Sequence, residues 1–149
     1  MDQRFANKVM VITGAAQGIG QRVAELAAQQ GAKLARVDRS PLVQELRDRL
    51  AAITDVIAVE VDLETFQGAE QAAEAAFKAF RRIDILVNIV GGTIWTKPFE
   101  HYSPEEIEAE VRRSLFPTLW GCRAVLPYML KKKKGAIVNI DVALIKDGW

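Results

Sequence analysis

Short apolar runs alternate with segments of helical periodicity along the chain, and this alternation strongly restricts the fold. Five runs, many of them rich in β-branched residues, predict strands at residues 8–13, 33–38, 56–61, 83–87 and 135–140. The first run has four consecutive apolar residues, Val9 to Ile12, as expected of a strand buried on both faces. Strands that alternate with helices form parallel sheets covered by helices on both sides. We therefore expect one α/β domain over residues 1–149, with a doubly wound sheet in the strand order 3-2-1-4-5.

Helices are expected between these strands, at residues 18–30, 41–52, 64–80 and 103–131. Ser40 and Pro41 form a start signal for the second helix, and Ser103 with Glu106 forms a capping box at the start of the last. Pro117 lies inside that last helix and should kink it, because proline has no backbone N–H. Apolar residues at helical spacing in this segment are expected to point inward: Ile107, Val111, Leu115, Leu119, Cys122, Val125 and Leu126.

The composition excludes several classes of partner and site. Twenty Lys and Arg residues balance 19 Asp and Glu residues, which argues against a nucleic-acid or membrane-surface binder. Cys122 is the only cysteine and His101 the only histidine, so the chain can form no internal disulfide and no Cys/His metal cluster. No apolar run approaches the roughly 18 residues that span a bilayer. We expect a cytoplasmic protein, and we interpret the lysines at 131–134 as charges that complement a helix end.

A glycine-rich turn follows the first strand. Gly14, Gly18 and Gly20 stand in a G-x-x-x-G-x-G pattern, with Gln17 and Ile19 between them. Gly14 permits a sharp exit from the strand, Gly18 lets backbone approach a pyrophosphate, and Gly20 lets the helix pack closely on the sheet. Free N–H groups at the helix start favour an anion. The turn therefore predicts a Rossmann-like dinucleotide site, with a merely tight βα turn as the alternative.

Asp38 ends the second strand, 18 positions after Gly20. This is close to the spacing of about 20 at which a carboxylate binds the ribose hydroxyls of adenosine. Its charge would repel a 2′-phosphate, which favours NAD over NADP. Arg39 leaves NADP open, because an arginine there can accommodate that phosphate. Asp38 could instead be a carboxylate that stabilises a helix start.

Together with Asp62-Leu63 and Asn88-Ile89-Val90-Gly91, these residues resemble the short-chain dehydrogenase/reductase family. The resemblance implies that Asp62 and Leu63 lie near the adenine, and that Asn88, Val90 and Gly91 lie along the cofactor and the central sheet. The family usually has Asn-Asn-Ala-Gly at the last of these positions, so the second asparagine is replaced here. Four separate loops agree with the family in order.

Within this family, residues 91–102 and 108–120 are similar to the benzoate cis-diol dehydrogenases. That resemblance implies oxidation of a dihydroxycyclohexadiene carboxylate to a catechol, with release of carbon dioxide and hydride transfer to NAD. It also implies that the loop with Trp95 lines the substrate pocket. A simple packing role for Trp95 and Phe99 remains the alternative.

The family's catalytic residues are expected to be missing. The resemblance implies a Tyr-Lys pair on a helix after the fifth strand and a serine before it, but Val142 stands at the serine position. Ser114 stands where most members have an asparagine. The string from Tyr128 to Lys132 precedes the fifth strand and should lie at the opposite end of the sheet from the cofactor.

We therefore expect an incomplete short-chain dehydrogenase, truncated before the later strands of the family fold. It would be the NAD-binding part of an oxidoreductase and inactive as this chain alone. The alternative is a non-catalytic or engineered minimal Rossmann domain that binds nucleotides or acts as a scaffold. The apolar face of the helix at 103–131 and the fifth strand would be exposed, so we expect either self-association through that helix or a C-terminal segment that covers these surfaces.

Overall fold

The computed structural model describes residues 3–140, which form a layered α/β domain. In chain order the elements are β1 Val9–Thr13, α1 Gly18–Gln29, β2 Lys33–Asp38, α2 Leu42–Leu50, β3 Val56–Glu60, α3 Phe66–Phe80, β4 Ile85–Asn88, the 3₁₀ helix η1 Phe99–His101, α4 Pro104–Ser114, α5 Phe116–Lys131 and β5 Ala136–Asn139. Each expected strand is present, with its ends shifted by no more than a few residues.

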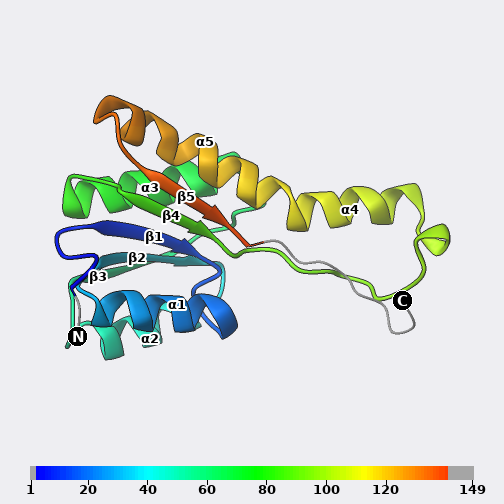
Figure 1. Ribbon diagram of the computed structural model, residues 1–149. Helices are drawn as coiled ribbons and strands as arrows, with labels where there is room; N and C mark the ends of the chain where they lie inside the picture. The colour runs from blue at the N-terminus through cyan, green and yellow to red at the C-terminus, as the bar shows by residue number, and fades with distance from the viewer. Residues whose placement is uncertain (1–2, 141–149) are drawn as a thin grey trace.

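The sheet is parallel and has the order β3-β2-β1-β4-β5, which confirms the predicted fold class. Figure 1 shows α1 and α2 against one face and α3 and α5 against the other, while α4 projects beyond the carboxyl ends of the strands. All parallel strands end at the same side of a doubly wound sheet, so the loops after β1, β2, β3 and β4 meet there.

Two apolar cores lie on the two faces of the sheet. On β1, Val11 packs with alanines of α3, whereas Met10 and Ile12 pack with Ala24 and Ala27 of α1. This division follows from the alternation of side chains along a strand. All five residues of β1 are buried, as the apolar run from Val9 to Ile12 predicts for a central strand.

Helix and strand starts differ from the sequence expectation in small ways. Pro41 is the N-cap of α2 rather than its first helical residue. The helix α3 begins at Phe66 because Thr65 caps it, its hydroxyl accepting a hydrogen bond from the Gly68 amide at 3.1 Å. The strand expected from residue 83 begins at Ile85 and extends to Asn88.

The segment at 103–131 is two helices, α4 and α5, separated at Leu115. The predicted capping box of Ser103 and Glu106 is present at the start of α4. Pro117, in the first turn of α5, explains the break, because it cannot donate the backbone hydrogen bond that would continue α4. The kink predicted at this proline is thus confirmed as a change from one helix to the next.

The predicted inward face of this segment was mostly wrong. Val125 is buried, but Leu115 and Leu119 are each 48% exposed, and Val111 and Leu126 are also exposed. The buried residues of α5 are mostly small side chains or proline: Pro117, Gly121, Ala124, Val125 and Met129. Apolar periodicity could not identify this face, because α5 approaches β4 closely through Gly121, where an added Cβ would lie 2.5 Å from Asn88 Oδ1.

Candidate functional site

A cavity of about 600 Å³ opens at the carboxyl ends of the strands. This volume is typical of small-molecule sites, which also favour this position in doubly wound sheets. Its walls include the following predicted cofactor residues: Gly14, Gln17, Ile19, Asp38, Arg39, Asp62, Leu63, Val90 and Gly91. The structure therefore brings four predicted loops together around one space.

Three predicted residues are not among these walls. Gly18 has φ +58° and open space around it. Gly20 packs beneath the turn, since a Cβ there would lie 2.0 Å from the Gly14 carbonyl oxygen. Asn88 is 1% exposed, and its Nδ2 donates to Asn139 Oδ1 at 2.9 Å and to Cys122 Sγ at 3.6 Å. Asn88 thus joins β4 to β5 and α5 within the central sheet. It does not line the cavity.

Sequence reasoning missed other walls of the cavity: Ser40, Val61, Glu64, Ile89, Arg113 and Ile140. Four of these stand next to, or one residue from, predicted residues and could have been included on that ground. Arg113 comes from the last turn of α4 and has no local signal, because only the folded position of α4 places it beside the cavity.

The turn after β1 has the geometry that an anion site requires. Gly14 has φ +66°, a left-handed conformation that favours glycine. The N-cap residue of α1, Gln17, makes no side-chain capping bond, and the first turn of the helix contains no acidic residue. The N–H groups and positive dipole end of α1 therefore face the cavity without a competing side chain.

Thr13 connects this turn to the loop after β4. Its hydroxyl oxygen accepts hydrogen bonds from the amides of Ile89 at 3.0 Å and Val90 at 3.4 Å. Thr13 is 3% exposed, so these bonds are shielded from water. The two central loops of the cavity are consequently held in a fixed relation.

Asp38 is fixed at the cavity by two backbone amides. Its Oδ2 accepts from Ala16 N at 3.1 Å and its Oδ1 from Ser40 N at 3.0 Å. A carboxylate held in this way keeps free lone pairs for the hydroxyl groups of a ligand. The Asp38 carboxylate thus links the turn after β1 to the segment that precedes α2.

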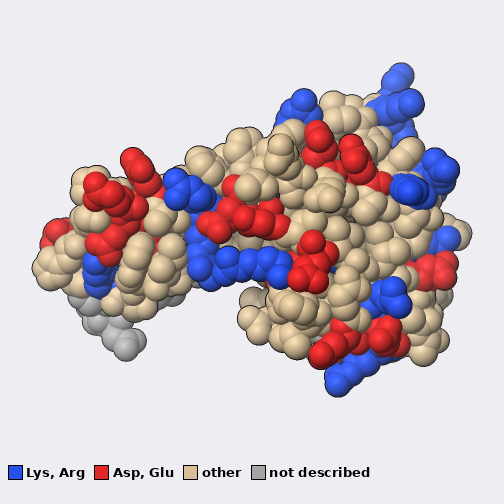
Figure 2. Space-filling model, turned by 180° about the vertical axis from the view of Figure 1, so that it is seen from behind, with Lys and Arg blue, Asp and Glu red and all other residues tan. Residues whose placement is uncertain are grey.

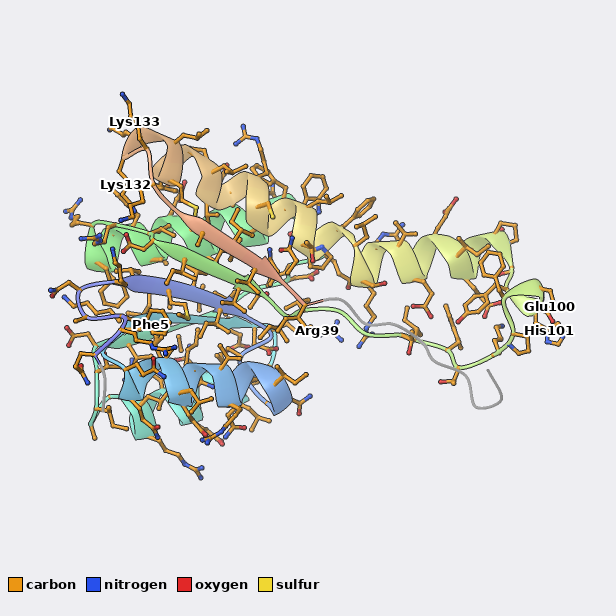
Figure 3. All side chains as sticks on the ribbon, viewed as in Figure 1. Phe5, Arg39, Glu100, His101, Lys132 and Lys133 are labelled. Carbon is orange, nitrogen blue, oxygen red and sulfur yellow. The ribbon has the colours of Figure 1, made fainter. Side chains whose placement is uncertain are left out.

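The cavity is also lined by Asp62, Glu64 and Arg39. Asp62 Oδ1 accepts from the Glu64 amide at 2.9 Å. Arg39 Nη1 and Glu64 Oε2 are 3.8 Å apart, and Arg39 has a 58% exposed side chain. Exposed pairs of this kind are weak, so Arg39 can be displaced by a ligand at little cost. Figure 3 shows Arg39 at this end of the sheet.

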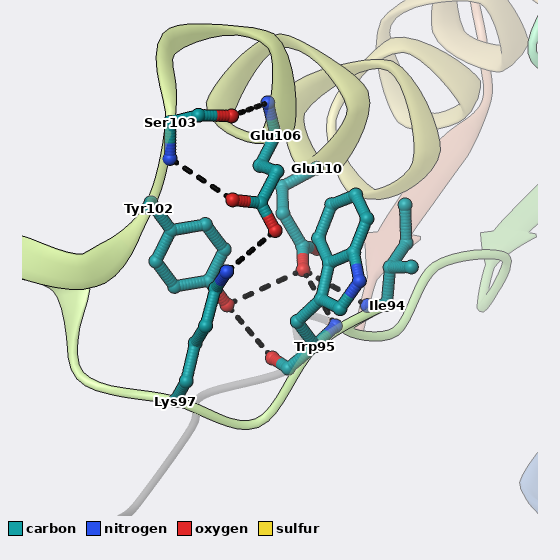
Figure 4. A network of polar contacts seen from close by, with 7 residues as sticks. All are labelled: Ile94, Trp95, Lys97, Tyr102, Ser103, Glu106 and Glu110. Carbon is teal, nitrogen blue, oxygen red and sulfur yellow. Dashed lines mark hydrogen bonds and ion pairs between the residues drawn. The ribbon is translucent and has the colours of Figure 1, made fainter.

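The loop between β4 and α4 is pinned to α4 by Glu110 (Figure 4). Glu110 Oε1 accepts from the amides of Ile94 at 2.9 Å and Trp95 at 3.0 Å. The Tyr102 hydroxyl donates to the Trp95 carbonyl at 2.7 Å and also lies 3.4 Å from Glu110 Oε1. Partial burial and the neighbouring Glu110 carboxylate raise the pKa of the Tyr102 phenol, so it remains a proton donor at neutral pH.

Lys97 closes the same network. Its Nζ is 2.6 Å from Glu106 Oε2 and lies 5.7 Å from the Trp95 ring and 5.2 Å from the Tyr102 ring. Trp95 therefore packs against its own loop and is not among the cavity walls. These contacts describe how Trp95 packs, and the pocket-lining role implied by the resemblance stays a prediction.

The structure describes some of the residues considered for catalysis and not others. Ser114 is the last residue of α4, and its hydroxyl donates to the Glu110 carbonyl. Val142 lies outside the described residues. Burial raises the pKa of the Cys122 thiol, so it is not a reactive thiolate. Tyr128 stacks on Phe77, with ring centroids 4.8 Å apart, and lines no part of the cavity.

Two further features bear on the sequence expectations. Among residues 3–140, no group of three or more His, Cys, Asp or Glu side chains is arranged to hold a metal ion. In the same part of the chain, no helix combines the length and apolarity that a membrane crossing needs. Acidic and basic side chains are interspersed over the face in Figure 2, in keeping with the balanced charge of the sequence.

Comparisons with known proteins agree with this fold. The 1,6-dihydroxycyclohexa-2,4-diene-1-carboxylate dehydrogenase of Pseudomonas putida is 57% identical over 141 residues, which are 95% of this chain and 52% of that protein. The enzyme of the same name from Acinetobacter baylyi is 55% identical over 140 residues, covering 93% of this chain and 54% of the enzyme. The chain thus spans about half the length of the curated relatives it matches.

The structure of levodione reductase superimposes with a TM-score of 0.86 and 28% sequence identity, covering 91% of this chain and 54% of that one. Residues 8–148 match the short chain dehydrogenase family. This match includes each loop that forms the cavity. The chain therefore belongs to the short-chain dehydrogenase family.

Proposed function

We propose that this chain is the NAD-binding part of an oxidoreductase that oxidises a cis-dihydrodiol carboxylate to a catechol. The observation that carries the proposal is the cavity formed by Gly14, Asp38, Asp62 and Val90 at the carboxyl ends of the strands. The family supplies the nicotinamide chemistry, in which bound NAD accepts a hydride. The two relatives named for a dihydroxycyclohexadiene carboxylate support the substrate class.

The residues of the chain fit a dinucleotide in a definite order. The uncapped start of α1 offers backbone N–H groups to a pyrophosphate. Asp38, held by Ala16 N and Ser40 N, would accept hydrogen bonds from ribose hydroxyls. Asp62 and Leu63 would lie at the adenine. These roles assign the adenosine half of the cofactor to residues that all lie in the described part of the chain.

NAD is the proposed cofactor rather than NADP. A 2′-phosphate would lie beside the Asp38 carboxylate, whose two backbone bonds prevent it from turning away. Arg39, whose exposed pair with Glu64 at 3.8 Å is weak, could offset part of this repulsion but would not remove the Asp38 charge. We therefore expect weaker binding of NADP than of NAD.

Calorimetric titration of the purified chain with NAD and NADP tests the proposal. Replacing Asp38 by alanine should weaken NAD binding about tenfold, because charge-assisted hydrogen bonds to the ribose are lost. Asp48→Ala, which removes an exposed carboxylate on α2, is the matched control and should change nothing. Equal NAD affinities for wild type and Asp38→Ala would contradict the role of Asp38.

We further propose that this chain alone does not turn over substrate. The sequence has one Tyr-x-x-x-Lys string, and neither Tyr128 nor Lys132 lines the cavity. The hydroxyl of Ser114 already donates to a backbone carbonyl. A rise in NADH absorbance with NAD and the diol would contradict this proposal while leaving the binding site intact.

The alternative is a non-catalytic or engineered minimal Rossmann domain that binds nucleotides or acts as a scaffold, and it is motivated by Val142 at the serine position and by Tyr128 and Lys132 lying away from the cavity. It shares the NAD-binding expectation but predicts no response to the diol, even when a complete catalytic half is supplied in trans. Self-association through α4 and α5 stays a prediction. It agrees with the exposure of Leu119 and Leu130, which are 48% and 69% exposed.

A further inference from the structure

Arg36 is a fully buried cation at the centre of the sheet. It lies on β2, opposite Ile12 of β1 and Ala58 of β3, and its exposed fraction is 0%. An interior strand of a parallel sheet normally carries apolar residues at such a position. A buried guanidinium is unfavourable unless its donors are paired. The position therefore needs an explanation that packing does not provide.

The partners of Arg36 are in the glycine-rich turn. Its Nη2 donates to the carbonyl oxygen of Ala15, which is itself fully buried. Asp38 is two residues further along β2, so it projects from the same face of the strand. Asp38 Oδ2 accepts from the amide of Ala16. The Ala15 carbonyl and the Ala16 amide belong to one peptide group, so Arg36 and Asp38 hold that peptide group at its two ends.

This peptide group lies between Gly14 and Gln17, both of which line the cavity. Its orientation decides where the following N–H groups of the turn point. Burial lowers the pKa of Arg36, and the negative charges of Glu25 and Asp38 nearby oppose that shift and favour the charged guanidinium. The contact is therefore an ionic support for the turn that is in place before any ligand binds.

Most of the hydrogen-bonding capacity of Arg36 is not used for stability. Its Nε and Nη1 are buried and have no hydrogen-bond partner among residues 3–140. Such unpaired donors oppose folding. An apolar side chain of similar length would therefore be tolerated by the fold, yet it could not hold the Ala15 carbonyl.

We propose that Arg36 is a positioning residue for the dinucleotide site, which acts by fixing the Ala15–Ala16 peptide group for cofactor binding. The inference rests on the proposed function, because it assigns the turn to NAD. A positioning residue changes the NAD affinity of the site without lowering the stability of the fold, whereas a purely structural residue would lower both.

The variants Arg36→Met and Arg36→Lys test this role by calorimetric titration with NAD and by urea unfolding. Arg36→Met should bind NAD about tenfold more weakly, while its unfolding midpoint stays the same or rises. Arg36→Lys keeps a charged donor and should bind within about threefold of wild type. Arg22→Met is the matched control, because Arg22 is an exposed arginine of α1 that pairs with Glu25 at 3.0 Å.

A second measurement does not depend on NAD. Without nucleotide, amide hydrogen exchange in a peptide spanning residues 13–20 should be faster in Arg36→Met than in wild type or Arg22→Met. Exchange in α3 should not change. Faster exchange confined to the turn would support the proposal, because it shows that the guanidinium orders this segment.

The outcomes separate the two proposals. If wild type binds NAD, and Arg36→Met binds equally well with unchanged exchange, the positioning role is overturned and the proposed function stands. If Arg36→Met loses its cooperative unfolding transition, Arg36 is a structural residue and the positioning role is again overturned. If wild type does not bind NAD, the proposed function fails, and the exchange of the turn alone decides whether Arg36 orders it.

Discussion

The two ends of the sheet use charged side chains in opposite ways. At the amino end, Asp84 is 4% exposed and its carboxylate is surrounded by donors. It accepts from Arg82 at 2.7 and 2.8 Å, from Lys132 at 2.6 Å and from the Val9 amide at 2.9 Å. Backbone bonds of Asp84 also reach β1 and the start of β5. The buried Asp84 carboxylate is thus the centre of an ion cluster at the amino end of the sheet.

At the carboxyl end, the Asp38 carboxylate accepts hydrogen bonds from backbone amides, and Arg39 pairs loosely with Glu64. Figure 3 shows Lys132 and Arg39 at these two opposite ends. Polar groups that are fully paired stabilise the fold, whereas groups with remaining capacity can bind a ligand. The comparison teaches that a carboxylate near a strand end indicates function only when its other partners leave lone pairs free.

The largest expected effect comes from Gly20→Ala at the carboxyl end. The added Cβ would lie 2.0 Å from the Gly14 oxygen and 2.7 Å from the Gly14 carbonyl carbon, so α1 would have to move. We expect a loss of about 3 kcal/mol in the free energy of unfolding and loss of NAD binding. Gly18→Ala is the control: nothing lies within 4 Å of its added Cβ, and its φ of +58° should cost about 1 kcal/mol. Equal losses in urea unfolding would contradict the close packing of α1.

A smaller effect is expected from Asp84→Asn at the amino end. Burial alone would raise the pKa of Asp84, but hydrogen bonds from Arg82, Lys132 and the Val9 amide outweigh it and hold the pKa far below its usual range. Removing this charge should cost about 2 kcal/mol of stability at neutral pH, with NAD affinity unchanged. Weaker NAD binding by this variant would contradict the view that the amino end stabilises the fold and only the carboxyl end binds the ligand.

The same variant gives a pH signature. Because the folded pKa of Asp84 is lower than its unfolded value of about 3.9, its contribution is complete above that pH and is lost as the pH falls toward the folded pKa. The stability difference between wild type and Asp84→Asn should therefore be constant from about pH 5 to 8 and shrink below about pH 4. A difference that grows with acidity would have the wrong sign for this cluster.

The smallest effect is expected from Lys132→Met. Lys132 has a 29% exposed side chain, and its ion pair with Asp84 is partly screened by solvent. We expect a loss of at most about 1 kcal/mol, reduced further by salt. Lys131→Met changes an exposed neighbour and should have no effect in the same unfolding experiment. If the two variants unfold with equal stability, the ion pair with Asp84 contributes nothing, and Lys132 acts only as one of the charges that complement the helix end, as the sequence indicated.

The fold and most of the cavity could be predicted because they depend on local signals. The apolar run at β1, the glycines from Gly14 to Gly20 and the acidic end of β2 each carry their meaning within a few residues. Parallel topology then places the loops together without further information. The strand order and the predicted walls of the cavity follow from these rules.

The rest depends on contacts between distant segments. Arg113 reaches the cavity only because α4 projects past the strand ends, and Lys132 joins Asp84 across 48 positions of sequence. The buried face of α5 is formed by Gly121 and small residues, which hydrophobic periodicity does not weigh. Arg36 interrupts an apolar strand, and its partner is a backbone carbonyl that no sequence pattern reveals.

Hydrogen exchange with and without saturating NAD tests the contrast between the two ends most directly. We expect protection in peptides that cover residues 14–20, 38–40 and 61–64, together with the loop after β4. Peptides around Asp84 and Lys132 should exchange at the same rate in both conditions. Absence of protection at the carboxyl end, or protection at the amino end, would contradict the assignment of the cavity to the cofactor.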